Sequence, residues 1–201
     1  MNRAFDALRS RIRSLPTVVQ ESARALLERE SELRARLYPL RDTRLITSRI
    51  RQHGDYQLSN IFYTGNDFVI ANFEGNPERP LSERRIKRSA FRDVSSMIRS
   101  FHYISHAVLY GQVPGIVPRS EENPRLERWA NAWYIWVSAA FLAAYMEFGD
   151  GSVFVPQAQK ERAILLESYT IEKALVEIEF ELAHRPDWVS IPVNGILDLL
   201  R

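Results

Sequence analysis

The stretch 53–75, HGDYQLSNIFYTGNDFVIANFEG, constrains the fold of this chain more than any other. Its centre, residues 64–67, reads Thr-Gly-Asn-Asp, which is typical of a tight turn. Ile-Phe-Tyr precedes the turn and Phe-Val-Ile follows it, and both runs favour strands. The pattern therefore predicts an antiparallel β-hairpin in which Tyr63 lies opposite Phe68.

Three oxygen-bearing side chains are expected to meet at the open end of this hairpin. Counting back from the turn, the ladder places Asn60 and Ser59 opposite Ala71 and Asn72. Asp55 lies just ahead of the first strand, so its carboxylate joins the two amides. Such a group is suited to holding a hard cation or a metal–phosphate complex.

The motif His53-Gly54-Asp55 followed by Asn60 resembles the catalytic loop of the aminoglycoside-phosphotransferase-like kinases, H-G-D-x-x-x-x-N. Other motifs resemble one branch of that superfamily, the maltokinases, including those fused to trehalose synthase. A single short motif is a weak signal, whereas many in one order are specific. The resemblance runs from about Leu15 to Leu200 and includes FEG at 73–75, RPLSERR at 79–85, KRS at 87–89, RDV at 92–94, RSFHY at 99–103, WVSAAFL at 136–142 and RPDWV at 185–189.

The resemblance implies roles for five residues of this region. Asp55 is the expected catalytic base, which orients a sugar hydroxyl and accepts its proton. Asn60 and Asn72 are expected to bind magnesium and, with it, the phosphates of ATP. His53 and Asp93 are expected to be structural, with the Asp93 carboxylate accepting backbone N–H bonds from the catalytic loop. The alternatives are an acid bonded to turn amides for Asp55 and helix N-capping for Asp93.

Sugar recognition is implied for the C-terminal helices. Polar side chains beside an aromatic ring are what binding a disaccharide requires. The alternative is a solvated helix face with charges of both signs. The expected substrate-binding residues are Glu172, Lys173, Glu177 and Arg185, with Asp187 and Trp188 following them.

Two departures from the family pattern bear on activity. The family has Asp-Phe-Glu-Gly after the second strand, and its aspartate is the main magnesium ligand. Here that position is Asn72, which keeps a neutral oxygen and loses the charge that a hard cation prefers. In addition, no glycine-rich loop or strand-rich stretch precedes His53. We therefore expect the N-terminal lobe to be absent, and the chain to be a fragment, one half of a split enzyme or a decayed relative.

The expected fold class is α+β and mostly helical: the C-terminal lobe of a protein-kinase-like fold with a small β-hairpin. We expect a single domain over 1–201, with a helical arm at 1–38, the catalytic loop and hairpin at 45–75 and a helical subdomain at 86–201. Periodicity and breakers give the remaining boundaries. They are helices over 2–14, 17–37, 90–110, 125–148 and 160–184, Thr17 as an N-cap, Pro39 as the end of the second helix, a loop over 111–124 and a short final segment from Pro192 to Leu200.

The predicted helix 125–148 carries three of the four tryptophans, interleaved with alanines. This pattern favours close helix packing in the core, and stacking on a sugar face is the alternative. His102 and His106 lie four residues apart without a third ligand nearby, so they give only a weak metal signal.

Composition excludes several classes of function. The 201 residues are 45% hydrophobic, enough for one core. The 27 basic and 25 acidic residues leave a net charge of +2, which argues against nucleic acid as a partner. The absence of cysteine excludes disulfides and thiolate metal sites. No apolar run approaches the roughly 18 residues of a membrane span, so we expect a cytoplasmic protein.

Two functions follow as hypotheses. In the first, the chain is the C-terminal lobe of a maltokinase-like enzyme that converts ATP and maltose to maltose 1-phosphate, and it is inactive in isolation. In the second, it is a non-catalytic, pseudokinase-like module that binds a maltosaccharide or a trehalose synthase. A helical scaffold without a ligand is a third reading. The expected protein partners are a separately encoded N-lobe or a second copy bound through the face that such a lobe would cover.

Overall fold

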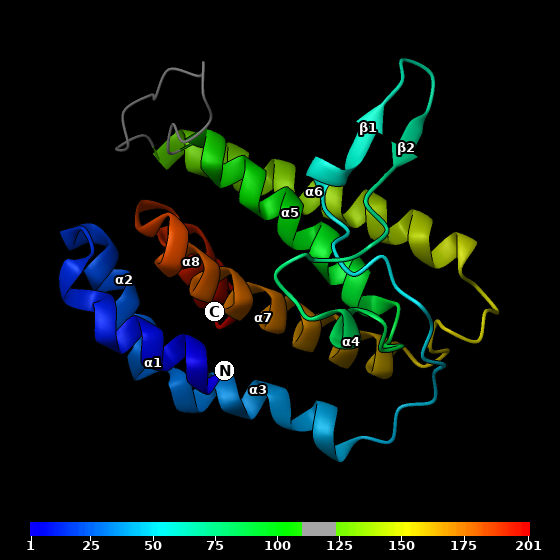
Figure 1. Ribbon diagram of the computed structural model, residues 1–201, viewed down its shortest axis with the longest axis horizontal. Coiled ribbons are helices and arrows are strands. Elements are labelled where there is room, and N and C mark those ends of the chain that lie inside the picture. The colour runs from blue at the N-terminus through cyan, green and yellow to red at the C-terminus, as the bar shows by residue number, and fades with distance from the viewer. Residues whose placement is uncertain (110–123) are drawn as a thin grey trace.

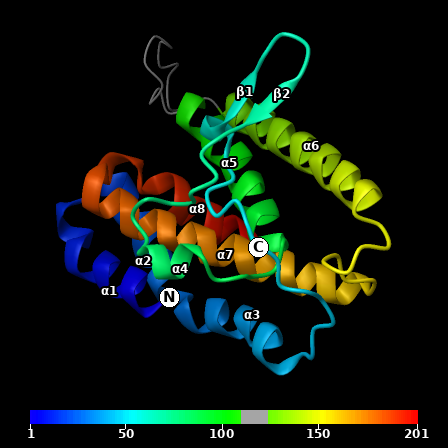
Figure 2. The same ribbon diagram turned by 45° about the vertical axis from the view of Figure 1, so that its right-hand side comes forward.

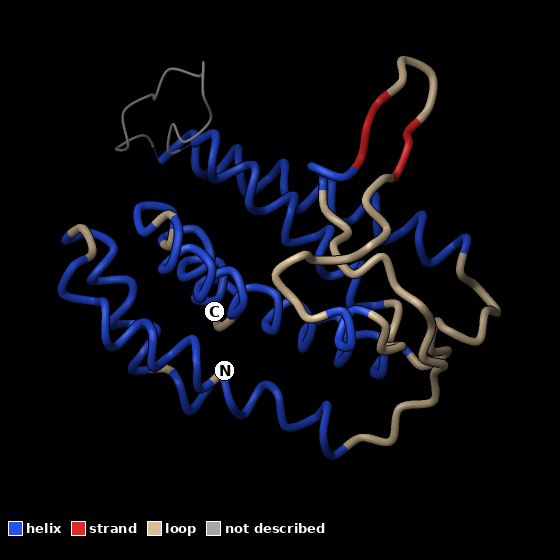
Figure 3. The backbone as a smooth tube through the Cα atoms, viewed as in Figure 1, coloured by secondary structure: helices blue, strands red, loops and turns tan. Residues whose placement is uncertain are grey.

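The computed structural model describes residues 1–109 and 124–201 and folds them mostly into helices, with one small antiparallel sheet (Figures 1 and 3). The loop predicted over 111–124 lies outside the described residues, except for Pro124, which begins a helix. The elements are α1 (Asn2–Arg11), α2 (Thr17–Glu28), α3 (Glu30–Asp42), β1 (Ile61–Tyr63), β2 (Phe68–Ile70), α4 (Leu81–Arg84), α5 (Phe91–Leu109), α6 (Pro124–Phe148), α7 (Gln159–His184) and α8 (Ser190–Leu199), with short 3₁₀ turns at Ile12–Ser14, Leu58–Asn60 and Pro186–Trp188.

Helix α7 lies at the centre of the helical body. It packs against α1 and α3 on one side and against α5 and α8 on the other, and α6 packs on α5 (Figures 1 and 2). The main core joins apolar faces of α1, α2, α3, α7 and α8, where burial removes apolar surface from water. Its fully buried side chains include Phe5, Leu8, Leu26, Leu33, Ile171, Ile178, Leu182 and Ile196. Within the described ranges, no helix is both long and apolar enough to cross a bilayer.

The N-terminal arm differs from the prediction at Arg29, where the single helix expected over 17–37 is broken into α2 and α3. The backbone of Arg29 has φ −96° and ψ 14°, and its guanidinium donates to the Glu32 carboxylate at 2.8 Å and to the carbonyl of Leu200. The break allows α2 to pack on α8 while α3 packs on α7. Helical periodicity alone does not show such a change of partner.

Two predicted helix boundaries are also wrong. Thr17 is the first residue of α2 rather than its cap, and no side chain caps this helix. Pro39 lies inside α3, which continues to Asp42. A proline removes one backbone donor but keeps its carbonyl, and the Pro39 carbonyl accepts the N–H of Thr43 at 3.0 Å. The helix therefore continues for most of another turn.

The predicted hairpin register is confirmed. Tyr63 pairs with Phe68, and Ile61 pairs with Ile70 at the other end of the ladder. The hairpin projects from the helical body (Figure 1), and both Tyr63 and Phe68 are mostly exposed. Its closed end carries the tight turn, so its open end faces the helices and the candidate site.

The tryptophans of α6 lie outside the core, so the core prediction for them is wrong. Trp129, Trp133 and Trp136 are 65%, 46% and 77% exposed. Helix α6 packs on α5 mainly through other aromatic rings, such as Phe141, whose ring centre lies 5.8 Å from that of Phe101, with an edge-on contact of Trp133 to the same ring at 6.4 Å. Because α6 has aromatic residues on both faces, its sequence did not indicate which face is buried.

Candidate active site

The loop that carries Asp55 is fixed to the first turn of α5. The Asp93 carboxylate accepts the backbone N–H groups of His53 at 2.7 Å and Gly54 at 3.0 Å. A backbone bridge between Ile50 and Arg88 holds the chain just before the loop. Burial raises the pKa of Asp93, and the two N–H donors oppose that rise. The contact that the sequence resemblance implied for Asp93 is thus present.

His53 connects the two sides of the loop. Its Nδ1 accepts the Asp55 N–H at 3.2 Å, so its proton lies on Nε2, which donates to the Ala71 carbonyl at 2.7 Å. The ring is 9% exposed and packs 4.9 Å, between ring centres, from Phe73. Both ring nitrogens of His53 are therefore bonded to backbone groups of the chain.

Asp55, Asn60 and Asn72 form a continuous chain of hydrogen bonds, so the predicted convergence is confirmed. Asn60 Nδ2 donates to Asp55 Oδ2 at 3.1 Å and to the Asp55 carbonyl at 2.8 Å. Asn72 Nδ2 in turn donates to Asn60 Oδ1 at 2.8 Å. Gln57 donates a further bond to Asp55 Oδ2 at 3.2 Å. One carboxylate oxygen is thus fixed by two amides.

Backbone conformation places Asn72 at the end of this chain. Its φ is +62°, in the left-handed region, which asparagine adopts more readily than most residues. Gly54 and Gly75 also have positive φ, and a Cβ on Gly54 would lie 3.3 Å from the Gly75 Cα. The catalytic loop and the segment after β2 are therefore in backbone contact.

These three side chains are a poor fit to a magnesium site. Asp55 supplies the only carboxylate, and Asn60 Oδ1 already accepts a bond from Asn72. Magnesium in phosphotransferases is usually held by one or two carboxylates together with substrate phosphates. No group of three or more His, Cys, Asp or Glu side chains suited to a metal occurs in the described part of the chain. With asparagine at position 72, this group lacks a second carboxylate for the cation.

Asp55 opens onto a large cavity of about 480 Å³, within the usual range for small-molecule sites. Its walls come from the catalytic loop, the segment after the hairpin, α5 and α7. Three of the four predicted substrate-binding residues, Lys173, Glu177 and Arg185, line it. Its other polar and aromatic lining includes Gln57, Ser59, Asn76, Glu78, Ser96, Ser100, Tyr103, Phe180 and Glu181.

Two ion-paired acids, Glu177 and Glu181, line the large cavity, and both are buried. Arg99, 1% exposed, donates from Nε and Nη2 to Glu177 Oε2 at 3.1 and 2.6 Å. At the second acid, Tyr103 donates to Glu181 at 2.5 Å, and Arg185 makes two bonds to the same carboxylate. Burial, together with this hydrogen bond, raises the pKa of Tyr103, which keeps the phenol protonated. Both acids are therefore held by cations at fixed positions.

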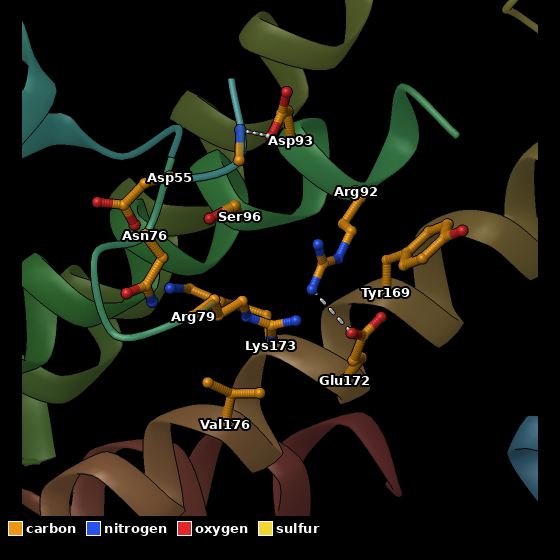
Figure 4. Close-up of a pocket in the computed structure, with 11 residues that line it drawn as sticks. Asp55, Asn76, Arg79, Arg92, Asp93, Ser96, Tyr169, Glu172, Lys173 and Val176 are labelled. Carbon is orange, nitrogen blue, oxygen red and sulfur yellow. Dashed lines mark hydrogen bonds and ion pairs between the residues drawn. The ribbon is translucent and has the colours of Figure 1, made fainter. Parts of the chain in front are cut away.

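Glu172, the fourth predicted residue, lies in a smaller cavity of about 30 Å³ that adjoins the large one at Asp55 and Lys173 (Figure 4). It forms an ion pair with Arg92 at 3.0 Å. Arg79 and Lys173 also line this cavity, so its three basic side chains lie among three acids, Asp55, Asp93 and Glu172. Glu172 thus shares the smaller cavity with Lys173 and lies apart from Glu177 and Arg185.

Several residues that line the large cavity were not predicted from the sequence. Ser96, Ser100 and Tyr103 lie four and three residues apart on one face of α5. Glu177 and Glu181 lie four residues apart on one face of α7. Facing stripes of polar residues on two long helices were the available signal, but which stripes face each other depends on the tertiary packing.

The comparisons with known proteins agree with this geometry. The chain matches no protein-family model. It is 24% identical over 209 residues to a glucosamine kinase of Streptacidiphilus jiangxiensis, covering 98% of this chain and 41% of that protein. It is also 24% identical over 148 residues to a glucosamine kinase of Mycolicibacterium smegmatis, covering 74% of this chain and 34% of that protein.

Solved structures give the same result for the fold. A glucosamine kinase in complex with glucosamine, ADP and inorganic phosphate matches with a TM-score of 0.71 and 24% identity, over 98% of this chain and 46% of that one. A second crystal form matches with the same TM-score over 99% and 45%. The chain is similar to sugar kinases. It spans less than half the length of the relatives it matches, and these are glucosamine kinases rather than maltokinases.

Proposed function

We propose that this chain is the C-terminal lobe of a sugar kinase and supplies the catalytic loop and the sugar-binding cavity of the complete protein. The observation that carries the proposal is the position of Asp55, fixed at the edge of a cavity of about 480 Å³ with polar and aromatic walls. Similarity to the glucosamine kinases supports the same assignment. In the complete protein, ATP would be the phosphoryl donor.

Asp55 is the proposed catalytic base. Hydrogen bonds from Gln57 and Asn60 fix Oδ2, and no bond to Oδ1 occurs among the described residues. A carboxylate held in this way orients a sugar hydroxyl and accepts its proton. As the hydroxyl oxygen forms its bond to the transferred phosphorus, the bond from phosphorus to the ADP oxygen breaks. Because the side chains at 60 and 72 are a poor magnesium site, no step is assigned to a metal here.

Two sugars are candidates for the substrate. The motifs of the chain favour maltose, phosphorylated at its anomeric hydroxyl, whereas the relatives favour glucosamine. The large cavity is lined by four acids, Asp55, Glu78, Glu177 and Glu181, against two cations, Lys173 and Arg185, and a sugar ammonium would complement this excess of acids. We therefore place glucosamine first and maltose second.

A non-catalytic module is the alternative, favoured by Asn72 in the position of the magnesium-binding aspartate. Such a pseudokinase-like domain would bind a maltosaccharide, or a trehalose synthase, without transferring phosphate. The catalytic proposal in turn calls for a phosphate-binding N-lobe, either in a longer form of this chain or encoded separately.

Titration calorimetry with glucosamine and maltose, with and without Mg-ATP, tests these proposals. A sugar kinase lobe should bind one of the sugars, and Glu177→Gln should weaken that binding at least tenfold. The matched control is Glu167→Gln, on α7 but outside the lining of the large cavity. Binding that does not respond to nucleotide supports the module, and no binding of either sugar contradicts both the kinase lobe and the sugar-binding form of the module.

A further inference from the structure

The outer face of α6 carries an apolar stripe that the helical body leaves exposed. Residues spaced by three or four positions lie on one side of a helix. In this stripe the tryptophans come first and the alanines follow. Its members are Trp129, Trp133, Trp136, Ala140 and Ala143, with Glu147 at the end, and all six are exposed.

Three exposed tryptophans in one line are unusual on a free surface, and large exposed apolar patches mark interaction sites. The opposite face of α6 is already occupied, since Tyr134 and Phe141 pack their rings against His102 and Phe101 of α5. Trp133 lies at the margin of the stripe, because its ring centre is also 6.4 Å from that of Phe101, and it is still 46% exposed. Figures 1 and 2 both show α6 at the edge of the helical body. The stripe is therefore available to a partner.

The order of large and small residues makes the stripe complementary to itself. If a second α6 lies antiparallel, with a two-fold axis at the level of residue 138, Trp136 of one copy meets Ala140 of the other. The same operation brings Trp133 to Ala143, so each large ring fits over a small side chain. Such a reciprocal contact is what an isologous two-fold interface requires.

The charges at the two ends of α6 follow the same symmetry. Arg125 and Arg128 lie at its N-terminal end, Glu147 and Asp150 lie at its C-terminal end, and all four are exposed. Antiparallel pairing brings the basic end of one copy to the acidic end of the other, where opposite charges attract. The helix dipoles also oppose each other in this arrangement.

We propose that this face binds the same face of a second copy of the chain, through an antiparallel α6–α6 pair. A buried aromatic side chain contributes roughly 150–250 Å². At their exposed fractions, three tryptophans per protomer supply on the order of half of the roughly 800 Å² per partner that a stable interface buries. The alanines and charged ends add to this area. The proposal does not depend on the sugar kinase function.

Sedimentation velocity over a range of concentrations tests the proposal first. The chain should dimerise, and Trp136→Ala should weaken the dimer at least tenfold. Phe68→Ala is the matched control, because it removes an equally exposed ring from the hairpin and should leave the dimer intact. Circular dichroism confirms that each variant remains folded. A chain that stays monomeric at every concentration overturns the proposal, and so does a dimer sensitive only to Phe68→Ala.

Charge reversal tests the orientation. Arg128→Glu and Glu147→Arg should each weaken the dimer, because each places like charges at both ends of the pair. An equimolar mixture of the two variants should form a heterodimer, and the double variant should again form a homodimer. Failure of both rescues excludes the antiparallel pair. A monomer whose tryptophan fluorescence is quenched by maltooligosaccharides would show that the face binds sugar instead.

Discussion

Arg99 of α5 and Glu177 of α7 form a buried ion pair of 2.6 Å, and the carboxylate of that pair lines the cavity onto which Asp55 opens. A cation inside the core thus fixes an acid at the proposed substrate site. Nε and Nη2 of Arg99 both donate to Oε2 of Glu177, and no bond to Oε1 of Glu177 occurs in the described ranges. Glu177 therefore has an acceptor oxygen left for a ligand.

Arg99→Met should destabilise the chain by about 3–5 kcal/mol, because it leaves a buried carboxylate without its cation. Adding Glu177→Leu should recover much of the free energy of unfolding, since no unpaired charge remains. Sugar binding should stay lost in the double variant. Urea unfolding and titration calorimetry measure the two effects separately. Recovery of sugar binding along with stability would mean that Glu177 has only a structural role.

Gly195→Ala, in α8, should also destabilise the chain and weaken sugar binding, because it disturbs Arg99. A Cβ on this residue of α8 would lie too close to Arg99 Nη1 and 3.0 Å from His102 Cε1. Overpacking of this kind costs roughly 1–3 kcal/mol, and moving Arg99 should displace Glu177 and weaken sugar binding. Asn194→Ala, at the neighbouring position of α8, is the control. Equal unfolding midpoints for the two variants would contradict the prediction.

Asp93→Ala should destabilise the catalytic loop, because it leaves the N–H groups of His53 and Gly54 without an acceptor. The His53 N–H is part-buried, and an unsatisfied buried donor costs roughly 1–3 kcal/mol, whereas the exposed Gly54 N–H can bond to water. Asp93→Asn retains one acceptor oxygen and should recover part of the loss. Hydrogen exchange of the two amides, together with urea unfolding, measures the effect. Unchanged protection of these amides in the alanine variant would show that other groups hold the loop.

Asn72→Asp should raise the affinity for Mg²⁺ or Mn²⁺ at least tenfold, about 1.4 kcal/mol, because it restores a second carboxylate beside Asp55. Aspartate tolerates the left-handed backbone of this position as asparagine does. Asn66→Asp in the hairpin turn is the control for added charge alone. Calorimetry with the metal salt provides the measurement, and equal affinities for the two variants would mean that a carboxylate at position 72 does not join Asp55 in binding the cation.

Stability should fall as the pH drops from about 7 to 5. Burial lowers the pKa of both His102 and His106, whose rings stack 4.1 Å apart. Below about pH 6.5 the unfolded chain takes up protons that the folded chain does not, so each histidine costs up to roughly 1.4 kcal/mol per pH unit. The two neutral histidines therefore leave the free energy of unfolding at its full value above about pH 6.5, and this free energy decreases as the pH falls below that value.

The measurement is urea unfolding at a series of pH values, compared with the variant His102→Gln/His106→Gln. The variant should show a shallower loss of stability on acidification, whatever its absolute stability. The raised pKa of Asp93 acts in the opposite direction and is common to both proteins, so it cancels in the comparison. Equal slopes for the two proteins would mean that other groups govern the acid sensitivity.

Local signals in the sequence were enough to predict the hairpin and the group at its open end. The turn residues fix the register, and the register brings Asn60 to Asn72, so no distant information is needed. The long helices were also predictable, since α5, α6 and α7 have the expected bounds to within a residue or two.

The predictions that were wrong concern how the helices pack against one another. The break at Arg29 reflects a change of packing partner, and the exposed Trp136 reflects the choice between two aromatic faces of α6. The ion pair of Arg99 and Glu177 joins residues 78 positions apart, which no local pattern reveals. Glu172 remains a prediction as a substrate-binding residue: it lines the adjoining cavity with Asp55 and Lys173 and forms an ion pair with Arg92 of α5.

The close approach of Gly54 to Gly75 limits how this site can move. With no side chain between the two backbones, neither loop is able to slide past the other or tilt alone. Any rearrangement that shifts Asp55 must carry the segment after β2 with it. The loop that carries Asp55 and the segment after β2 would then move together as one rigid unit. Any side chain at Gly54 or Gly75 would push these two segments apart.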